Sequence, residues 1–346
     1  MRPLPVVNTM VRWRDAVDRA EAFLGSCDDP RGLPPALVAL DPAFNEAIRP
    51  ARVRSVARHR LGVDIGFDLG DEAFSAMSAL TLLPPHGPTS PLADRLVRFV
   101  EHSRRGHRYS FFVDVPEFAA DTDCTALAGA ALYRWGRRTA GDLARTAAEL
   151  LSAAADVDQG DELRRGVLMV YWEDGAEPAA LPRGRKHDAV ACANALFTVK
   201  LAGVPGHPVI RETLRYLLNH LTTERYRRGT RYYPSPDAFL YAASRLCARF
   251  ADCARVLGRP LRTAVSERPA AAGGSGPLSL ALRVVAADNL GVRRHQAERR
   301  SLLAGLQARD GSWPASPYFR MGRVPVYFGS RQLTTLFAAR ALRPPA

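Results

Sequence analysis

The chain has 346 residues, 47% of them hydrophobic, and its 48 lysines and arginines against 35 acidic residues give a formal net charge of +13. The length allows two average domains or one large helical domain, and the apolar fraction is enough for a sizeable core. The charge is compatible with an anionic ligand, a nucleic acid or a membrane surface. A nucleic-acid partner is disfavoured, because the arginines are scattered through amphipathic helices and form no basic arm or zinc-finger spacing.

The first 60 residues contain a basic helix over Val11–Gly25 and a proline-rich passage over Pro30–Pro50. No secretory leader pattern opens the chain, and no apolar run reaches the roughly 20 residues of a membrane span. The five cysteines are odd in number and show no CxxC spacing. We therefore expect a cytoplasmic protein with reduced cysteines, in which residues 1–60 form an outer helix and a lid segment.

From residue 71 onward, apolar helices with small side chains alternate with helices that carry one apolar stripe and many charges. Helices that are apolar all round belong inside a fold, and amphipathic ones belong outside. The pattern predicts an all-α, single-domain (α/α)6 barrel over residues 1–346, with six inner and about six outer helices; an open helical solenoid is the alternative. The six inner helices are expected to begin at Asp71, Asp121, Asp188, Asp237, Pro277 and Ser330, and outer helices are expected over Pro91–Arg105, Thr139–Ala155, His207–Thr223 and Arg293–Gln307.

Strand patterns are scarce. Short strands are expected only at Tyr109–Val113 and Gly166–Tyr171, and the glycine-rich stretch 268–277 is typical of a loop. Because inner and outer helices alternate along the chain, all inner helices run in the same sense. Their N-termini are therefore expected at one rim of the barrel.

The most informative segment is DTDCTA over residues 121–126, which places two carboxylates at the start of an apolar helix. Burial and a neighbouring carboxylate both raise the pKa of a carboxyl group, so such a pair can keep a proton near neutral pH and donate it to a weak base. The alternative is a helix cap, in which Asp and Thr side chains accept hydrogen bonds from free backbone N–H groups.

Two motifs carry a family resemblance over roughly residues 60–345. The segment QARDGSW, from Gln307 to Trp313, resembles the QW repeat of squalene–hopene cyclases, and DTDCTA resembles the DxDDTA or DxDTT acid motif of class II terpene cyclases. The resemblance implies that Asp123 is the acid that protonates a terminal alkene or epoxide of a linear isoprenoid, and that Asp121 tunes it. Cys124 stands where the family motif has a third acidic residue or a threonine.

Arginine-rich loops precede three of the predicted inner helices, and helix N-termini and guanidinium groups both attract anions. The resemblance therefore favours a prenyl diphosphate, with its tail in the barrel and its head group at this rim. Solvated loop charges without a ligand are the alternative. Mg²⁺ is allowed as the counter-ion of a diphosphate, and no other cofactor and no zinc site are expected. The candidate head-group residues are Arg185, Lys186, Arg228 and Arg231.

Aromatic residues gather in the same loops, and their ring faces stabilise carbocations without attacking them. Trp313 is expected instead to clamp a helix to a loop. The residues expected to line the cavity are Trp172, Tyr232, Tyr233 and Phe239.

The rival hypothesis is a binding or carbohydrate-active (α/α)6 barrel in which DTDCTA is only a helix cap. Asp123 with Glu173 or Asp174 would then form the two-acid pair of an inverting glycosidase, but the apolar inner helices favour the cyclase. Related cyclases usually bury the site against a second helical domain, for which 346 residues leave no room. Either the first 60 residues and the long loops close the cavity, or a partner chain or second copy does, or the barrel has another use.

Overall fold

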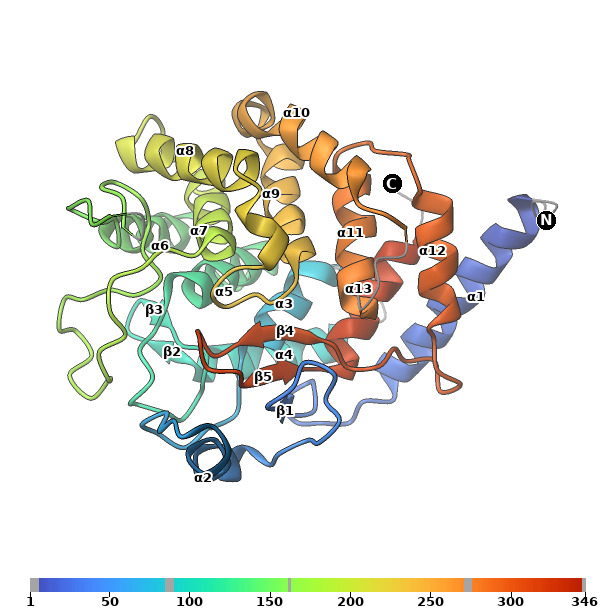
Figure 1. Ribbon diagram of the computed structural model, residues 1–346, viewed down its shortest axis with the longest axis horizontal. Helices are drawn as coiled ribbons and strands as arrows, with labels where there is room; N and C mark the ends of the chain where they lie inside the picture. The colour runs from blue at the N-terminus through green and yellow to red at the C-terminus, as the bar shows by residue number, and fades with distance from the viewer. Residues whose placement is uncertain (1–5, 85–89, 161–162, 271–275, 344–346) are drawn as a thin grey trace.

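The computed structural model describes residues 6–84, 90–160, 163–270 and 276–343. Within these ranges the chain forms thirteen α-helices and five short strands, which confirms the all-α prediction. Figure 1 shows helices along most of the chain, with the short strands confined to one side of the molecule.

Six helices are largely buried and form the inner layer. Each packs against the next in chain order, and the last packs against the first, so the six form a closed ring. Their alanine, leucine and valine side chains are buried on nearly all sides, as expected for helices inside a fold. They are α3 (Phe74–Leu82), α5 (Thr122–Arg134), α7 (Ala189–Leu201), α9 (Pro236–Arg249), α11 (Pro277–Asn289) and α13 (Arg331–Leu342).

Six further helices pack on the outside of this ring, and α8, α10, α12 and α1 follow its outer edge in Figure 1. Among them α10 was not predicted, because only Phe250 separates it from α9 and no loop signal marks the boundary. The outer helices are α1 (Val6–Gly25), α4 (Ser90–His102), α6 (Ala140–Ser152), α8 (Pro208–Thr222), α10 (Ala251–Glu267) and α12 (Gln296–Gly305). A short helix α2 (Pro50–Leu61) and a 3-10 turn η1 (Arg225–Arg228) complete the helical segments of the described ranges.

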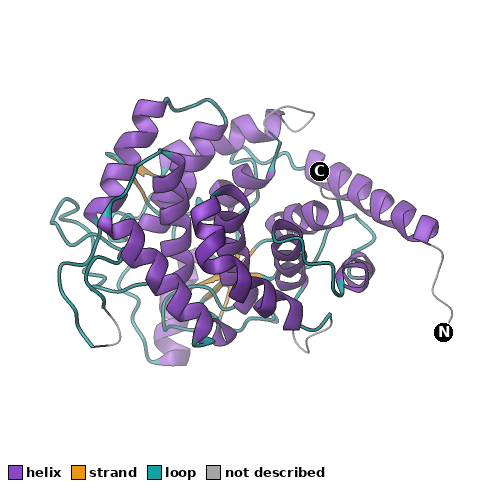
Figure 2. Cartoon of the chain, turned by 90° about the horizontal axis from the view of Figure 1, so that it is seen from above, coloured by secondary structure: helices purple, strands orange, loops and turns teal. Residues whose placement is uncertain are grey.

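A small antiparallel sheet, with strand order β1-β5-β4, covers one end of the ring. It joins β1 (Leu37–Ala39), β4 (Pro317–Arg320) and β5 (Tyr327–Gly329). The sheet lies below most helices in Figure 1, and its strands lie behind them in Figure 2, which is seen from above. It was not predicted, since two of its strands have three residues and β1 comes from the far end of the chain.

The strand predictions failed in detail. The expected strand at Tyr109–Val113 is reduced to a two-residue hairpin of β2 (Arg104–Arg105) and β3 (Arg108–Tyr109). The segment Gly166–Tyr171 forms no strand and makes one isolated bridge, between Leu168 and Ala154. Both segments are held instead by loop hydrogen bonds, such as that from the Met169 N–H to the Ala153 carbonyl at 2.9 Å.

Polar caps start most inner helices, but not always the expected ones. Asp121, Asp188 and Ser330 accept hydrogen bonds from backbone N–H groups of the first turn, as the sequence predicts. At α9 the cap is Ser235, and the expected cap residue, Asp237, lies inside the helix and forms a buried ion pair. The helix expected to begin at Asp71 begins at Phe74, and the Glu72 carboxylate accepts from the Ser75 N–H of its first turn at 2.8 Å.

The N-terminal helix and the C-terminal motif are joined. The Gln307 amide donates to the Ala16 carbonyl of α1 at 2.7 Å, and the buried Trp313 indole N–H donates to the Leu303 carbonyl of α12 at 2.7 Å. The prediction that Trp313 clamps a helix to a loop is therefore confirmed.

Candidate active site

Asp121 and Asp123 lie at the start of α5, and both side chains are buried. Asp121 caps the helix, because its Oδ1 accepts a hydrogen bond from the Cys124 N–H at 2.7 Å. Asp123 takes no part in capping. Its Oδ1 accepts from the Asn194 amide of α7 at 2.8 Å, and its Oδ2 accepts from the Tyr233 hydroxyl. The cap interpretation of DTDCTA thus accounts for Asp121 and leaves Asp123 unexplained.

The surroundings make both carboxyl groups weaker acids than free aspartic acid. Burial raises the pKa of Asp123 to about 6, although the hydrogen bonds from Tyr233 and Asn194 act in the opposite direction. Burial, followed by the charge of Asp123, raises the pKa of Asp121 to about 7. Two such groups in contact share their titration, so the pair keeps a proton close to neutral pH.

A tight turn positions Tyr233. The Thr230 N–H donates to the Tyr233 carbonyl at 2.7 Å, and the Tyr232 N–H donates to the Asp188 carboxylate at 3.2 Å. Gly229 makes the turn with a φ of +72°, and a Cβ atom at this position would lie 2.5 Å from the Tyr233 carbonyl oxygen. The turn therefore requires glycine, and Asp188 ties it to the start of α7.

Replacing Gly229 with alanine is expected to lower both stability and turnover, because the added Cβ displaces the Tyr233 backbone and strains the turn by about 1–3 kcal/mol. Gly203→Ala is the matched control, since Gly203 has a φ of +75° but nothing within 4 Å of an added Cβ. Chemical denaturation and initial rates of the two variants test this prediction. Equal losses of rate in both would show that Tyr233 does not depend on the turn.

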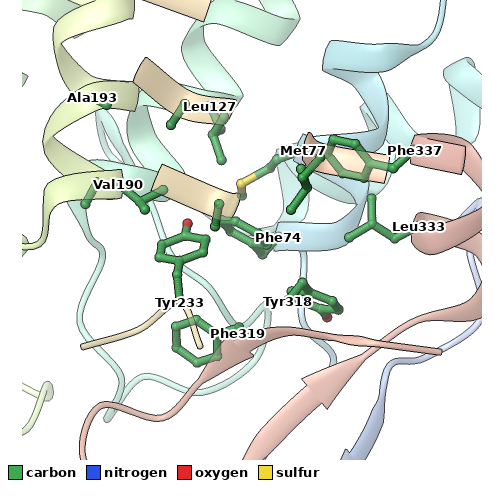
Figure 3. Packing of buried hydrophobic residues seen from close by; sticks show 14 of the residues in the cluster. Phe74, Met77, Leu127, Val190, Ala193, Tyr233, Tyr318, Phe319, Leu333 and Phe337 are labelled. Carbon is green, nitrogen blue, oxygen red and sulfur yellow. The ribbon is translucent and has the colours of Figure 1, made fainter. Parts of the chain in front are cut away.

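An apolar inner cavity of about 60 Å³ lies between the N-terminal halves of the inner helices and the sheet. Figure 3 shows side chains from α3, α5, α7 and α13 pointing toward one another here, with Tyr233 and Tyr318 among them. Asn194 and Tyr233, the two partners of Asp123, form part of its wall. The other aromatic side chains in the wall are Phe74, Tyr241, Tyr318 and Phe337.

A smaller cavity of about 20 Å³ lies directly against Asp121 and Asp123. Phe74 lines both cavities, while Asp121 and Asp123 line the smaller one. Rings close this side of the site, among them the stacked pair Tyr232 and Phe319, whose centroids are 5.8 Å apart. The remaining rings of the smaller cavity are Phe111, Phe118 and Tyr171.

At the opposite, C-terminal ends of the inner helices lies a wider opening of about 490 Å³, which we call the mouth. It shares Thr81, Tyr241 and Arg245 with the inner cavity. The inner cavity therefore reaches Asn194 and Tyr233, the two partners of Asp123, and shares its other lining with the mouth.

Two of the four aromatic residues expected in the cavity wall are found there. Tyr233 lines the inner cavity and Tyr232 lines the smaller one. Trp172 lies outside, where its indole donates to the Glu149 carbonyl at 3.1 Å and its ring stacks under Arg108. Phe239 is buried on the outer side of α9 against His220. Neither Trp172 nor Phe239 lines the two cavities or the mouth.

The candidate head-group residues lie at the sheet end of the ring. Arg185 forms an ion pair with Asp156, and Lys186 donates to the Arg183 carbonyl. Burial, with the charges of Arg231 and Arg183, lowers the pKa of Lys186 to about 8, so these cations lie close together. Arg228 is exposed at the end of η1.

These predicted loops converge, since the Arg320 guanidinium donates to the Thr230 and Arg231 carbonyls at 3.1 Å. Rings separate them from the acid pair: the Arg183 guanidinium lies 4.4 Å from the centroid of Phe118, which lines the smaller cavity. That these cations hold a head group remains a prediction.

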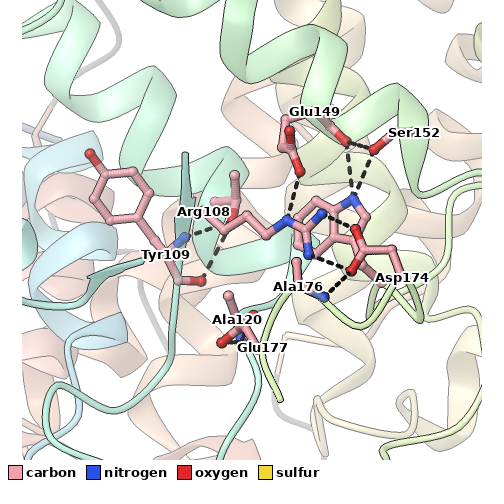
Figure 4. Close-up of polar contacts among 10 residues, drawn as sticks. Arg108, Tyr109, Ala120, Glu149, Ser152, Asp174, Ala176 and Glu177 are labelled. Carbon is pink, nitrogen blue, oxygen red and sulfur yellow. Dashed lines mark hydrogen bonds and ion pairs between the residues drawn. The ribbon is translucent and has the colours of Figure 1, made fainter. Parts of the chain in front are cut away.

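The carboxylates proposed for a glycosidase do not join Asp123. Asp174 pairs with Arg108, which also binds Glu149 at 2.6 Å (Figure 4). This pairing holds the pKa of Asp174 below its usual value. Neither Asp174 nor Glu173 lines the cavities or the mouth, so a two-acid cleft with Asp123 finds no support.

Asn194 and the arginines that line the mouth were not predicted from the sequence. Asn194 is a polar residue in the middle of an otherwise apolar helix, and a buried amide of this kind needs a hydrogen-bond partner. That signal was available in the sequence. In the part of the chain that the structure describes, no three His, Cys, Asp or Glu side chains group as metal ligands. No described helix is long and apolar enough to cross a membrane.

Known proteins that resemble this chain in sequence or in fold include terpene cyclases. No family model matches the chain. The drimenol cyclase of Aspergillus calidoustus is 26% identical over 247 residues, which are 68% of this chain and 41% of that protein. The chain thus spans about two fifths of the length of this relative.

Solved structures are similar over a greater length. A type II terpene cyclase from Scytonema, in complex with its substrate geranylgeranyl dihydroxybenzoate, superimposes with a TM-score of 0.66 at 13% identity and covers 98% of each chain. The ent-copalyl diphosphate synthase from Streptomyces platensis superimposes with a TM-score of 0.54 at 18% identity, over 78% of this chain and 49% of that one. The chain has the fold of the type II terpene cyclases, which confirms the resemblance seen in its sequence.

Proposed function

We propose that this chain, which has the fold of the type II terpene cyclases, protonates and cyclises a linear isoprenoid, with Asp123 as the general acid. One observation carries the proposal. Asp123 is a buried carboxyl group with a raised pKa, held by Asn194 and Tyr233 where these two residues wall an apolar cavity. A helix cap requires neither these partners nor this position.

In the proposed reaction the distal alkene of the substrate lies next to Asp123. The π electrons of the alkene take the carboxyl proton, a C–H bond forms, and the adjacent carbon becomes a cation. Attack by the next alkene closes a ring and passes the cation along the chain, until it loses a proton or captures water. The Asp123 carboxylate left behind accepts hydrogen bonds from Tyr233 and Asn194, and Asp121 tunes the proton affinity of the pair.

The walls fit a cationic intermediate. Phe74, Tyr318 and Phe337 present rings to the inner cavity, and ring faces stabilise a cation without forming a bond to it. The neighbouring Leu127 and Val190 offer no nucleophile that would end the reaction early.

We also propose that the ring of six inner helices and the outer helices around it form an (α/α)6 barrel, which the N-terminal segment of the chain closes. The strand β1 pairs with β5 at the sheet end, and α1 packs against α13. The match to the Scytonema structure over 98% of both chains supports a barrel of this extent.

The rate is expected to fall as the pH rises through about 6 to 7, because the acid pair must hold a proton to react. Tyr233→Phe removes a hydrogen bond that stabilises the Asp123 carboxylate, so it should move this fall to higher pH while lowering the maximal rate. Turnover measured from about pH 5 to about pH 9 tests both points. A rate that rises across this range would contradict a general acid.

The direct test is incubation with prenyl diphosphates of increasing length, followed by a search for cyclic products. Wild-type protein is expected to yield a cyclic product with at least one chain length, and Asp123→Asn to yield none. Cyclic product from Asp123→Asn at the wild-type rate, or none from wild type with any isoprenoid, would overturn the proposal.

A further inference from the structure

We infer that the mouth binds the anionic head group of the isoprenoid, by means of four arginines at the C-terminal ends of the inner helices. The inference deepens the proposed function and rests on it. It places the head group at the end of the ring opposite the loops that the sequence favours. The four residues are Arg134, Arg245, Arg249 and Arg340.

The arginines come from three different inner helices and meet at one opening. Arg134 ends α5, Arg245 and Arg249 belong to α9, and Arg340 lies in the last turn of α13. The volume of the mouth, about 490 Å³, is within the range of small-ligand sites. An opening built from separate segments of the chain in this way can surround a ligand.

These arginines lack the carboxylates that balance arginines elsewhere in the molecule, such as Arg31, Arg105 and Arg300. No acidic side chain lines the mouth, and none of the four forms an ion pair within the described ranges. Arg134 donates to the Thr81 carbonyl at 2.6 Å, and Arg245 donates to the Asn194 side chain at 3.2 Å. By contrast, Arg185 at the sheet end is already paired with Asp156.

The positive charges also act on one another. Burial and then the charge of Arg245, with a contribution from Arg340, lower the pKa of Arg134. Mutual repulsion of this kind is relieved by a bound anion. Guanidinium groups bind phosphate or carboxylate oxygens through paired hydrogen bonds, which fits a diphosphate and a carboxylate alike.

Helix dipoles offer a competing explanation, because cations in a last turn are favourable there. This explanation covers Arg134, Arg249 and Arg340, which lie in the last turns of their helices. It does not cover Arg245, which lies a turn earlier and lines both the mouth and the inner cavity. Nor does it require four cations at one opening without an acidic side chain.

The geometry connects the mouth to the acid. The Arg245 guanidinium donates to Asn194, and Asn194 donates to Asp123. These two hydrogen bonds link the mouth to Asp123. Along α5, Asp123 and Arg134 are separated by about 16 Å at 1.5 Å per residue. An isoprenoid chain anchored at the mouth would therefore place its distal alkene, rather than its head group, beside Asp123.

The experiment compares three substrates of one chain length, the prenyl diphosphate, the prenyl carboxylic acid and the prenyl alcohol, the first with and without Mg²⁺. For the Arg249→Ala, Arg340→Ala double variant, KM for a charged substrate is expected to rise at least about tenfold, since hydrogen bonds to charged groups contribute about 1.5–3 kcal/mol each. KM for the alcohol should change much less. Whichever anion shows the larger change identifies the head group. Arg255→Ala, an exposed arginine of α10, is the matched control.

Two outcomes would overturn the inference. One is a tenfold rise in KM for the charged substrates that occurs only in an Arg185→Ala, Arg231→Ala double variant, which would place the head group at the sheet end. The other is an equal change in KM for the alcohol and the anions, which would make the arginines structural.

Calorimetry with Asp123→Asn separates this inference from the proposed function, because it measures binding without turnover. Suppose that adding Arg249→Ala and Arg340→Ala, which together make the mouth variant, weakens binding of prenyl diphosphate, and that wild type forms no cyclic product. That result would support head-group binding at the mouth and reject the proposed reaction. Binding that is unchanged in the mouth variant, with normal cyclisation by wild type, would reject the mouth and keep the reaction.

Discussion

Asp123→Asn is expected to abolish turnover while the protein stays folded. Asparagine is close in size to aspartic acid and keeps a hydrogen-bonding group at this position, but it has no acidic proton to transfer to an alkene. General acid groups typically contribute roughly 100- to 10,000-fold in rate, and the loss here should reach or exceed the upper end because the reaction starts with this proton. Single-turnover rates with saturating substrate measure it.

Stability provides the control for this variant. The pKa of Asp123 is higher in the folded protein, at about 6, than in the unfolded chain. Its contribution to stability is therefore lost as the pH rises from the unfolded pKa through about 6, because the folded site resists ionisation. At about pH 8, Asp123→Asn should therefore be at least as stable as wild type. Asp121→Asn should slow turnover less than Asp123→Asn, since it alters the neighbouring group and leaves the donor. An Asp123→Asn protein that unfolds would show a structural role.

Asp237→Ala is expected to cause the largest loss of stability, about 3–5 kcal/mol, because it leaves a buried guanidinium without its carboxylate. The Asp237 and Arg283 side chains are both fully buried and lie 2.8 Å apart, so the pair joins α9 to α11 inside the ring. Arg268 adds a second contact to the same carboxylate at 3.2 Å. Denaturant unfolding of the variant gives the free energy of unfolding directly.

The matched control is Asp252→Ala, which breaks an ion pair with Lys200 whose carboxylate side is 46% exposed. The Lys200 side chain is 13% exposed, so the pair is only partly screened by water, and its loss should cost less than that of the fully buried pair. A loss for Asp237→Ala no larger than that for Asp252→Ala would mean that water or another group compensates the buried charge.

The sequence was sufficient to locate the inner helices and to single out Asp121 and Asp123. Small apolar residues on all sides of α5 and α7 can be accommodated only inside a helical fold, and their polar caps mark where they begin. Two aspartates two residues apart at such a start indicate an unusual carboxyl group. These features are local, so a single sequence shows them.

The features that escaped prediction depend on contacts between distant residues. Asn194 and Tyr233 reach Asp123 across 71 and 110 residues of chain, and no local pattern pairs them. The sheet joins strands from both ends of the chain, and the mouth gathers arginines from three helices. Phe239 was misplaced because α9 is buried on most sides, and its sequence does not show which buried face meets the cavity.

The most direct test of the central claim is a reaction in D₂O, because the Asp123 proton exchanges with solvent before it is transferred. The account predicts a cyclic product with one solvent deuterium at the carbon that received the proton, and with its head group intact. A cyclic product without solvent deuterium, or one formed with release of the head group, would contradict protonation by Asp123.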